Sequence, residues 1–236
     1  MYKLSDLHLV RKSWVKVAGI PSARIGYLLS DCTDLTKDDI DTVKTWLKLV
    51  KAKAVIKAVG KKSCGLGVLI YGKPGIGKTT LSLAIIQELL TKLPLDSFSP
   101  ADGKILLKPC YFATYNDVLD VKGRTMNDDP TEEDTLLWDG LLGESKDDAY
   151  NIRVLVIDDV GKEHASLSGW QKNQLHHVLR TRFNNGLPTI VTTNIARENW
   201  DGLYGDATAS FAKEAFTYLP INPARGDPVS YTHLRA

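Results

Sequence analysis

The sequence has little cysteine and no long hydrophobic segment. Its three cysteines, Cys32, Cys64 and Cys110, are odd in number and widely separated. This pattern argues against a disulfide framework and against a zinc site, and it suits a reducing compartment. No apolar run approaches the ~20 residues that span a bilayer, and residues 1–6 lack the apolar core of a secretory signal. We therefore expect a cytoplasmic protein without membrane association.

An excess of charge of one sign is also missing, since 30 basic and 28 acidic side chains leave a formal net charge of +2. The charges are nevertheless unevenly distributed, with lysines gathered before residue 63 and acids gathered in residues 127–148. The acidic segment is predicted to be a surface helix between loops, and its charge disfavours contact with nucleic acid. A chain of 236 residues accommodates one sizeable α/β domain with a small appendage.

Glycine is most informative between residues 72 and 79. The segment GKPGIGKT fits the phosphate-loop pattern G-x-x-x-x-G-K-[ST] at every fixed position. The glycines permit a tight turn in which successive N–H groups point at a phosphate chain. Lys78 is expected to reach the β- and γ-phosphates, and the Thr79 hydroxyl is expected to ligate Mg²⁺. The predicted nucleotide-binding residues are Gly72, Pro74, Gly75, Ile76, Gly77, Lys78, Thr79 and Thr80.

The surroundings of this motif support it against the alternative of an ordinary glycine turn. Residues 66–71 form an apolar run that is typical of a buried parallel strand, and residues 80–91 carry apolar side chains at helical spacing. A strand, a glycine loop and a helix in this order are the context that the motif requires. We therefore expect a nucleotide-binding site.

The rest of the core alternates strands with helices. Further strands are expected at 105–112, 152–157 and 188–193, and helices at 114–121, within 127–148 and at 168–184. This alternation predicts right-handed crossovers and a parallel sheet covered on both faces, which is a three-layer α/β/α sandwich of the P-loop NTPase class. The predicted divisions are a helical region at 1–62, an ATPase core at 63–222 and a tail at 223–236.

The N-terminal region contains one well-marked helix. Thr36 is the expected N-cap and Gly60 the expected end. Its lysines are Lys44, Lys48, Lys51, Lys53 and Lys57, and Lys61 and Lys62 follow it. Two interpretations stay open, namely a solvated polar face and a face that contacts phosphates or an acidic partner.

Two acids follow the apolar run of the 152–157 strand. Asp158 and Asp159 should lie at the carboxyl edge of the sheet, where ligands of open parallel sheets bind. We assign Asp158 with Thr79 to Mg²⁺, and Asp159 to polarising the attacking water. Asn194 ends the next strand and is expected to hold that water or to sense the γ-phosphate. Lys78, Asp159 and Asn194 are the predicted catalytic residues, with ATP and Mg²⁺ as cofactors.

The order GKPGIGKT, VLVIDDVGKEH and RTRFNNGLPTIVTTN resembles the AAA+ ATPases of the DnaC and IstB group, over residues 18–219. The resemblance implies a five-stranded parallel sheet in the order 5-1-4-3-2, an ATP-bridged homo-oligomer on single-stranded DNA, and a hexameric replicative helicase as partner. It makes Asn194 the sensor-1 residue. Arg182 matches a basic residue that is common before the sensor strand in this group. The equal alternative is a cation at the C-terminus of a helix, where the helix dipole favours it.

The chain departs from this group in the segment after Asn194. The resemblance places an inter-subunit arginine in the helix at 203–214, but Phe211 stands there, and no arginine lies between Arg197 and Arg225. Lys213 and Arg197 are the remaining candidates, and both are expected to do this poorly. An arginine finger contributes ~10³–10⁵ in rate, so we expect slow hydrolysis and little gain on self-assembly.

The last residues do not read as a packed element. Residues 229–236, VSYTHLRA, match one reading frame of a transposase-based sequencing adapter. We interpret them as non-native, with the biological chain interrupted near Asp227. An ordinary disordered tail is the alternative.

Three functions are compatible with these features. The leading hypothesis is an ATPase that loads a replicative helicase onto single-stranded DNA, in a phage or mobile element. The alternatives are an IstB-like helper of a transposase and a nucleotide-dependent scaffold that does not hydrolyse ATP. For DNA contact, Tyr111, Phe112 and Tyr115 offer stacking surfaces beside the N-terminal lysines, although strand core is the favoured interpretation of Tyr111 and Phe112.

Overall fold

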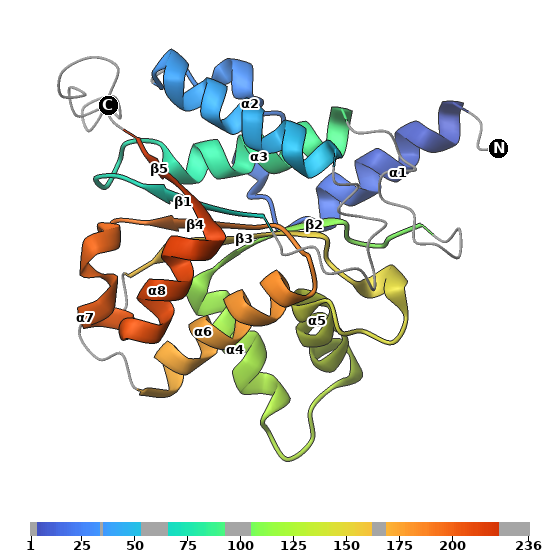
Figure 1. Cartoon of the computed structure of the whole chain (residues 1–236). Helices are drawn as coiled ribbons and strands as arrows, with labels where there is room; N and C mark the ends of the chain where they lie inside the picture. The colour runs from blue at the N-terminus through green and yellow to red at the C-terminus, as the bar shows by residue number, and fades with distance from the viewer. Residues whose placement is uncertain (1–3, 34, 53–65, 93–104, 162–168, 222–236) are drawn as a thin grey trace, which may run out of the picture.

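The computed structural model describes residues 4–33, 35–52, 66–92, 105–161 and 169–221. These residues form three layers, and the middle layer is a five-stranded sheet (Figure 1). The strands are β1 (Gly67–Tyr71), β2 (Cys110–Thr114), β3 (Val154–Val160), β4 (Thr189–Thr193) and β5 (Phe216–Pro220). Their spatial order is β2-β3-β4-β1-β5, and each neighbouring pair is parallel. Read from the other edge this is 5-1-4-3-2, so the predicted fold and strand order are confirmed.

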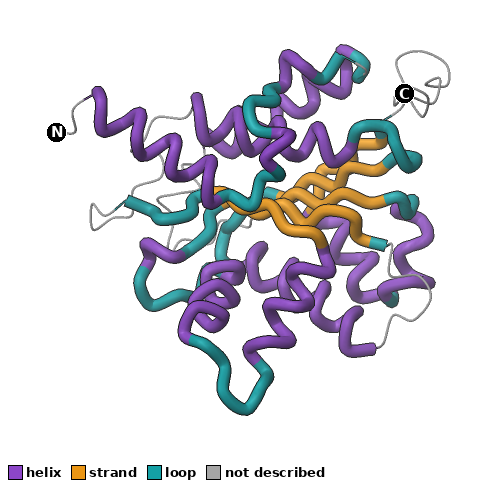
Figure 2. Tube along the Cα trace, turned by 180° about the vertical axis from the view of Figure 1, so that it is seen from behind, coloured by secondary structure: helices purple, strands orange, loops and turns teal. Residues whose placement is uncertain are grey.

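Helices cover both faces of the sheet (Figures 1 and 2). One face carries α1 (Leu4–Val17), α2 (Lys37–Ala52) and α3 (Lys78–Lys92). The other carries α4 (Tyr115–Thr125), α5 (Glu132–Leu142), α6 (Gly169–Asn184), α7 (Trp200–Tyr204) and α8 (Asp206–Ala215). Short 3₁₀ turns lie at Ser22–Arg24, Leu29–Asp31, Asp148–Tyr150 and Arg197–Asn199. Within the described ranges, no helix combines the length and apolar character that crossing a membrane would require.

The two faces of the sheet bury separate apolar clusters. Successive residues of a strand point to opposite faces, so a sheet covered on both sides buries both sets. Ile190 and Val191 illustrate this in β4, because each is completely buried and each belongs to a different cluster. This arrangement explains why the strands read as continuous apolar runs rather than as alternating patterns.

The N-terminal helices α1 and α2 pack into the cluster that also contains α3. Trp14 and Trp46 are both buried there, and the Trp14 Nε1–H donates to the Leu106 carbonyl at 2.7 Å. Thr36 caps α2 as predicted, since its hydroxyl accepts from the Asp39 N–H at 3.1 Å and its own N–H donates to the Asp39 carboxylate at 3.2 Å. The lysines of α2 whose side chains are described are exposed. The predicted helix end at Gly60, the cap at Ser168 and the tail at 223–236 lie outside the described residues.

Two strand boundaries differ from their predictions by three residues or more. The strand expected at 105–112 begins only at Cys110, because the preceding backbone bonds elsewhere: the Leu107 N–H donates to the Ala149 carbonyl at 2.8 Å. Pro109 has no N–H to add to a ladder, and its carbonyl accepts from the Val154 N–H at 3.0 Å. At the other boundary, β3 continues to Val160, so both acids lie within the strand rather than after it.

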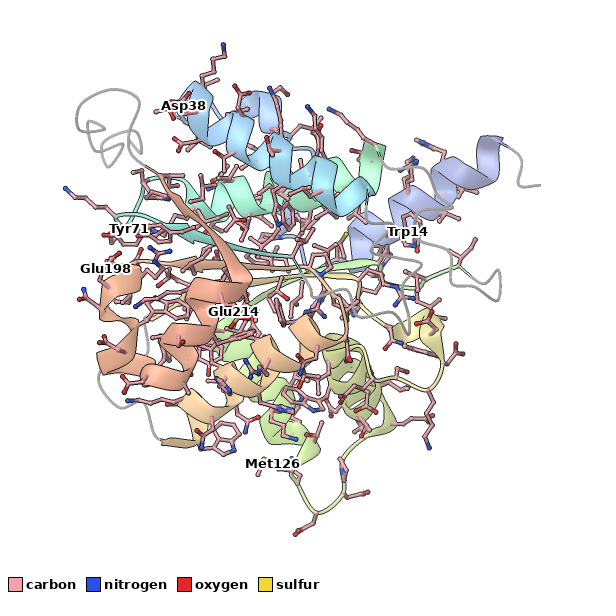
Figure 3. The ribbon with its side chains drawn as sticks, viewed as in Figure 1. Trp14, Asp38, Tyr71, Met126, Glu198 and Glu214 are labelled. Atoms are coloured by element: carbon pink, nitrogen blue, oxygen red, sulfur yellow. The ribbon has the colours of Figure 1, made fainter. Side chains whose placement is uncertain are left out.

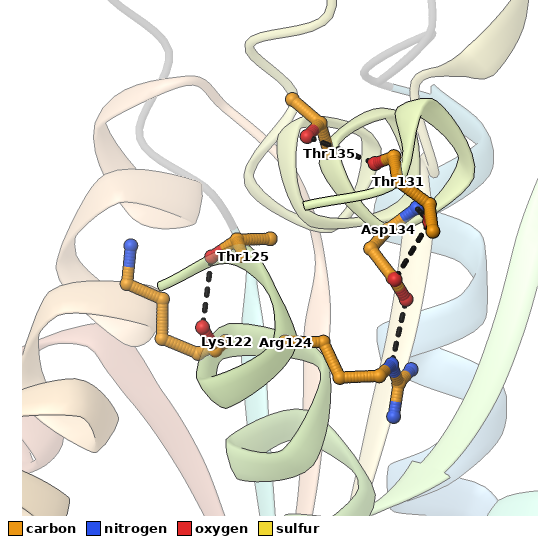
Figure 4. Close-up of polar contacts among 6 residues, drawn as sticks. All are labelled: Lys122, Arg124, Thr125, Thr131, Asp134 and Thr135. Atoms are coloured by element: carbon orange, nitrogen blue, oxygen red, sulfur yellow. Dashed lines mark hydrogen bonds and ion pairs between the residues drawn. The ribbon is translucent and has the colours of Figure 1, made fainter. Parts of the chain in front are cut away.

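The acidic helix expected within 127–148 is α5, and a hydrogen-bonded ion pair joins its first turn to the end of α4 (Figure 4). Thr131 caps α5 by accepting from the Asp134 N–H at 3.1 Å. The Arg124 Nε–H, at the end of α4, donates to the Asp134 carboxylate at 2.6 Å. Hydrogen bonds from Arg124 and then from Thr131 lower the pKa of Asp134. The far half of α5 is not a surface element, because Trp138 and Leu141 are buried.

Candidate nucleotide-binding site

The predicted site residues meet at the carboxyl edge of three adjacent strands. The phosphate loop follows β1, the acids lie in β3 and Asn194 follows β4, which is paired to both of the other strands. Thr193 is opposite Tyr71 in one ladder and opposite Val160 in the other. Figure 3 shows Tyr71 at this end of the sheet, together with Glu198 from the segment after β4, whereas Trp14 lies at the opposite end.

The loop glycines serve two different purposes. Gly75 and Gly77 have φ of +82° and +98°, a backbone conformation that L residues rarely adopt, and a Cβ on either would meet nothing within 4 Å. Glycine is therefore needed at these two positions for its positive φ, and not because a side chain would clash. Gly72 is needed for space, since its Cβ would lie 3.0 Å from the carbonyl oxygen of Ile221. Helix α3 follows directly, with the Leu81 N–H donating to the Gly77 carbonyl at 2.8 Å.

Lys78 lies inside the loop that it is predicted to serve. Its side chain is buried, and Nζ donates to the carbonyls of Gly72 and Lys73 at 2.8 Å each. Phosphate oxygens would take over as acceptors when a nucleotide enters. Arg24, which the sequence did not indicate, places Nη1 3.5 Å from the Thr80 hydroxyl. It lies outside every motif recognised in the sequence.

Thr79 and Asp158 are in direct contact, as a shared Mg²⁺ site requires. The Thr79 hydroxyl donates to the Asp158 carboxylate, with oxygen distances of 2.9 and 3.1 Å. Asp158 is buried. Nowhere in the described ranges do three or more His, Cys, Asp or Glu side chains gather as a metal cage. A hydroxyl and one carboxylate fit an ion that takes its other ligands from substrate phosphates and water, which is how Mg²⁺ is commonly held.

Asp159 lies at a strained point of β3. Its φ of +66° makes it the one non-glycine residue with positive φ in the part of the chain that the structure describes. The β3–β4 ladder is irregular at the same point, between Ile157 and Val160. Such bulges re-aim side chains, and strained residues gather at functional sites. The sequence pattern predicted the acid but not the backbone conformation that presents it.

Asn194 offers an unused acceptor beside these acids. Its Oδ1 is buried, and it has no hydrogen-bond partner among the described residues. Buried polar atoms are nearly always paired, so an orphan atom of this kind calls for a missing partner. A water molecule held against the γ-phosphate would donate to it. The orphan oxygen, the open glycine loop and the Thr79–Asp158 contact together fit a bound Mg²⁺–ATP.

Thr192 is a second residue that the sequence did not single out within this site. Its hydroxyl donates to Asp158 Oδ1 at 2.6 Å and accepts from the Asp159 N–H at 2.9 Å. The side chain is completely buried in β4. The signal available in the sequence was a threonine directly after the apolar pair Ile190 and Val191.

Arg182 proves to be a structural residue at the opposite edge of the sheet. Its side chain is completely buried. Its guanidinium donates to four carbonyls and one hydroxyl, those of Leu141, Ile152, Arg153, Pro188 and Thr189. Burial lowers its pKa to about 9, so the group is still protonated at neutral pH. Arg182 lies in the last turn of α6, where the helix dipole favours a cation, and its buried hydrogen bonds add a structural role.

Phe211 is a core residue. It is 2% exposed, and its ring packs edge-on against Phe183 and Phe216, with centroids 5.2 and 6.4 Å away. The side chain at this position of α8 therefore packs into the core of the chain. Of the two cations considered instead, Lys213 is exposed, and Arg197 holds its guanidinium carbon 4.8 Å from the ring centroid of Tyr218.

The aromatic residues considered for stacking on DNA are mostly inside the protein. Phe112 and Tyr115 are buried in the two apolar clusters. Tyr111 is half-buried, and Lys108 Nζ lies 4.5 Å from the centroid of its ring. The strand-core interpretation is confirmed for Phe112, and Tyr115 offers no stacking surface.

Comparison with known proteins confirms the resemblance to the DnaC and IstB group. Residues 134–213 match the model of the IstB-like ATP binding protein family. The matched range includes both acids, Asn194 and Phe211 but not the phosphate loop, so the loop stands on its own motif and geometry. A RuvB-like helicase 1 from Neurospora crassa is 57% identical over 42 residues, which are 18% of this chain and only 8% of that protein.

Solved structures share the fold. The DnaC helicase loader aligns over 86% of this chain and all of its own chain, with a TM-score of 0.58 and 20% identity. A replication initiator DnaA bound to AMPPCP and single-stranded DNA aligns over 84% of this chain and 50% of its own, with a TM-score of 0.52 and 16% identity. At these identities the similarity shows the fold alone, which is a P-loop NTPase α/β fold.

Proposed function

We propose that this chain hydrolyses ATP to ADP and phosphate. The observation that carries the proposal is the contact of Thr79 with Asp158 at 2.9 Å, at a sheet edge that also presents Asp159 and the unpartnered Asn194 oxygen. A structural glycine turn has no need of a phosphate-loop threonine bonded to an acid from another strand. Motif, acid pair and amide together form a phosphoryl-transfer site.

Each residue has a distinct task in this reaction. The N–H groups of the loop and the ammonium of Lys78 bind the phosphate chain, while Thr79 and Asp158 would hold Mg²⁺, which neutralises charge on the phosphates when bound. Asp159 accepts a proton from the attacking water. At the same time the water oxygen bonds to the γ-phosphorus, and the bond between the γ-phosphorus and the bridging oxygen breaks, so that ADP leaves. Asn194 accepts a hydrogen bond from the same water and so orients it.

The hydrolysis proposal is tested with two variants. Lys78→Ala should abolish binding of a fluorescent ATP analogue, and Asp159→Asn should keep binding but lower turnover about 10²–10⁴-fold, the usual contribution of a positioned base. Equal, near-zero turnover in wild type and Asp159→Asn would instead favour the non-hydrolysing scaffold. Wild type without nucleotide binding would overturn both alternatives.

For the biological role, we propose the loading of a hexameric replicative helicase onto single-stranded DNA in the cytoplasm. The similarity of the chain to the DnaC helicase loader, over all of the chain in that solved structure, supports this role. The test is capture of the source organism's replicative helicase by the purified protein, with and without an ATP analogue. Nucleotide-dependent capture is the expected result. Failure to bind the helicase in either state would contradict the loader.

The runner-up is an IstB-like helper of a transposase, which the family match over residues 134–213 supports. The two roles predict different DNA substrates. A loader should prefer a single-stranded oligonucleotide over its duplex in the presence of an ATP analogue, whereas the transposase helper should prefer the duplex. Binding to phosphates should weaken steeply with added salt in either role.

We propose ATP-dependent self-association with only weak activation of hydrolysis. The support is the burial of Phe211, because the expected inter-subunit arginine is absent and its position faces the core. The specific turnover should therefore rise little as the protein concentration passes through the assembly range. A strong concentration-dependent gain would contradict this expectation, and loss of that gain in Arg197→Ala would then identify the cation that reaches the neighbour.

A further inference from the structure

Thr192 occupies a position where an apolar residue would be expected. It lies in a strand whose preceding residues Ile190 and Val191 are apolar and completely buried, and it is itself 1% exposed. Valine has nearly the shape of threonine and is the ordinary occupant of a central parallel strand. The presence of a hydroxyl here therefore requires a reason in the contacts that the hydroxyl makes.

Those contacts join the two acids of the site. The Thr192 hydroxyl gives its single proton to Asp158 Oδ1 at 2.6 Å and uses a lone pair to accept the Asp159 N–H at 2.9 Å. Donation to a carboxylate is charge-assisted and is stronger than a bond between neutral groups. One side chain of β4 thus orients the carboxylate of one acid and the peptide of the next.

The bond to the Asp159 N–H falls where the backbone departs from regular geometry. Asp159 has φ of +66°, and the β3–β4 ladder is irregular between Ile157 and Val160. A bulge takes its extra residue out of ladder pairing. The Thr192 hydroxyl supplies the acceptor that the ladder does not, and so it holds the left-handed conformation of Asp159 in place.

The bond to Asp158 matters because Thr79 contacts the same carboxylate. The Thr79 oxygen can ligate Mg²⁺ through a lone pair while its proton stays on Asp158, so Thr79 would belong to the ion's shell. Thr192 lies in another strand, and its hydroxyl bonds the two acids instead of the phosphate loop. The two threonines therefore differ in task, although both lie within 3.1 Å of the carboxylate.

We propose that Thr192 is a positioning residue of the ATPase centre, orienting Asp158 toward Mg²⁺ and holding the left-handed turn at Asp159. The proposal rests on the proposed ATPase function. It predicts that the Thr192 hydroxyl contributes to the Mg²⁺-dependent part of nucleotide binding and to turnover, while the binding of nucleotide without metal does not depend on it.

Three variants isolate the hydroxyl. Thr192→Val removes it and keeps the shape, and Thr192→Ser restores it without the methyl group. Thr193→Val is the matched control, because Thr193 is the next residue of β4, is completely buried, and accepts a backbone hydrogen bond from the Ile195 N–H at 3.0 Å instead of contacting the acids. Thermal melts establish that each variant is folded at the assay temperature, and Thr192→Ala replaces the valine variant if that one is not.

The first readout is the affinity for a fluorescent ATP analogue, measured in Mg²⁺ and in EDTA. Thr192→Val should lose about tenfold in Mg²⁺ and nothing in EDTA, and its turnover should fall about tenfold to a hundredfold. Thr192→Ser and Thr193→Val should behave as wild type. On an Asp158→Asn background, Thr192→Val should have no further effect on the Mg²⁺ dependence, because the acid through which it acts is gone.

Two results would overturn the role of Thr192. One is a valine variant with wild-type Mg²⁺ dependence and turnover, and the other is equal impairment in the valine and serine variants, which would indicate packing. In both cases wild type binds nucleotide, so the ATPase proposal stands. A wild type that binds no nucleotide in either buffer overturns both proposals.

Discussion

Four residues, two at each edge of the sheet, differ in how their polar groups are satisfied. At the amino edge, the buried guanidinium of Arg182 donates to four carbonyls and one hydroxyl. Asn151, also buried just before β3, uses both ends of its amide, accepting from the Ser145 N–H at 2.9 Å and donating to Asp148 at 2.8 Å. At the carboxyl edge, Asn194 leaves a buried oxygen without a partner among the described residues, and Asp159 is held in a left-handed conformation.

The difference teaches that burial of a polar residue does not by itself mark a functional site. A group whose bonds are complete stabilises the fold, and any loss is felt as instability. A group held in strain or left with an open acceptor contributes little to stability, and its partner arrives with the ligand. Substitutions at the two edges should therefore separate stability from activity.

The largest effect on stability is expected at Arg182. Arg182→Leu removes the guanidinium that donates to five acceptors and should lower the free energy of unfolding by about 3–5 kcal/mol, measured by urea denaturation. Arg180→Leu, two residues earlier on α6 and exposed, is the control and should change it by less than about 1 kcal/mol. Equal effects of the two variants would remove the distinction between structural and surface cations.

A pair of asparagines gives the sharpest comparison of the edges. Asn151→Ala should cost about 1–3 kcal/mol, because it leaves the Ser145 N–H unsatisfied, and should keep the turnover per folded molecule. Asn194→Ala should change stability by less than about 0.5 kcal/mol but lower turnover about tenfold to a hundredfold. Urea denaturation and steady-state ATP hydrolysis on both variants decide. A stability loss at Asn194 as large as that at Asn151 would contradict the comparison.

Removal of the backbone strain at Asp159 should change stability less than Arg182→Leu or Asn151→Ala does, and should increase it. Asp159→Gly relieves a positive φ and should raise the free energy of unfolding by about 1 kcal/mol, while turnover is lost with the carboxylate. Asp129→Gly makes the same change at an exposed loop residue whose φ is not positive, and should slightly destabilise. Destabilisation by Asp159→Gly would show that the conformation is not strained.

The smallest effect is expected away from both edges, at the exposed pair Arg124–Asp134. The pKa of Asp134 is lower in the folded protein than its ordinary value, so its contribution to stability is present above that ordinary value and is lost as the pH falls through the lowered one. Arg124→Gln should slightly reduce the melting temperature at neutral pH and flatten its decline in acid. An unchanged acid limb would show that the pair does not contribute.

Local patterns predicted those parts of the site that contiguous residues determine. The phosphate loop depends on the conformations of neighbouring residues, and Asp158, Asp159 and Asn194 follow from the rule that parallel strands end at a common edge. The sequence missed Thr192 and Arg24, because their partners lie 33 to 56 residues away in the chain. It also missed the bulge that lets β3 run past both acids.

The sequence alone determined the chemistry that this protein carries, because residue types and their spacing decide which donors, acceptors and charges reach the edge of a parallel sheet. Only the tertiary structure decided what each buried group is for. Arg182 matched a family position before the sensor strand, and Phe211 stands where an arginine was expected, but the structure shows both side chains in contact with distant segments. The physical reason is that hydrogen-bond satisfaction and packing depend on which groups the fold brings together, and no local pattern contains that information.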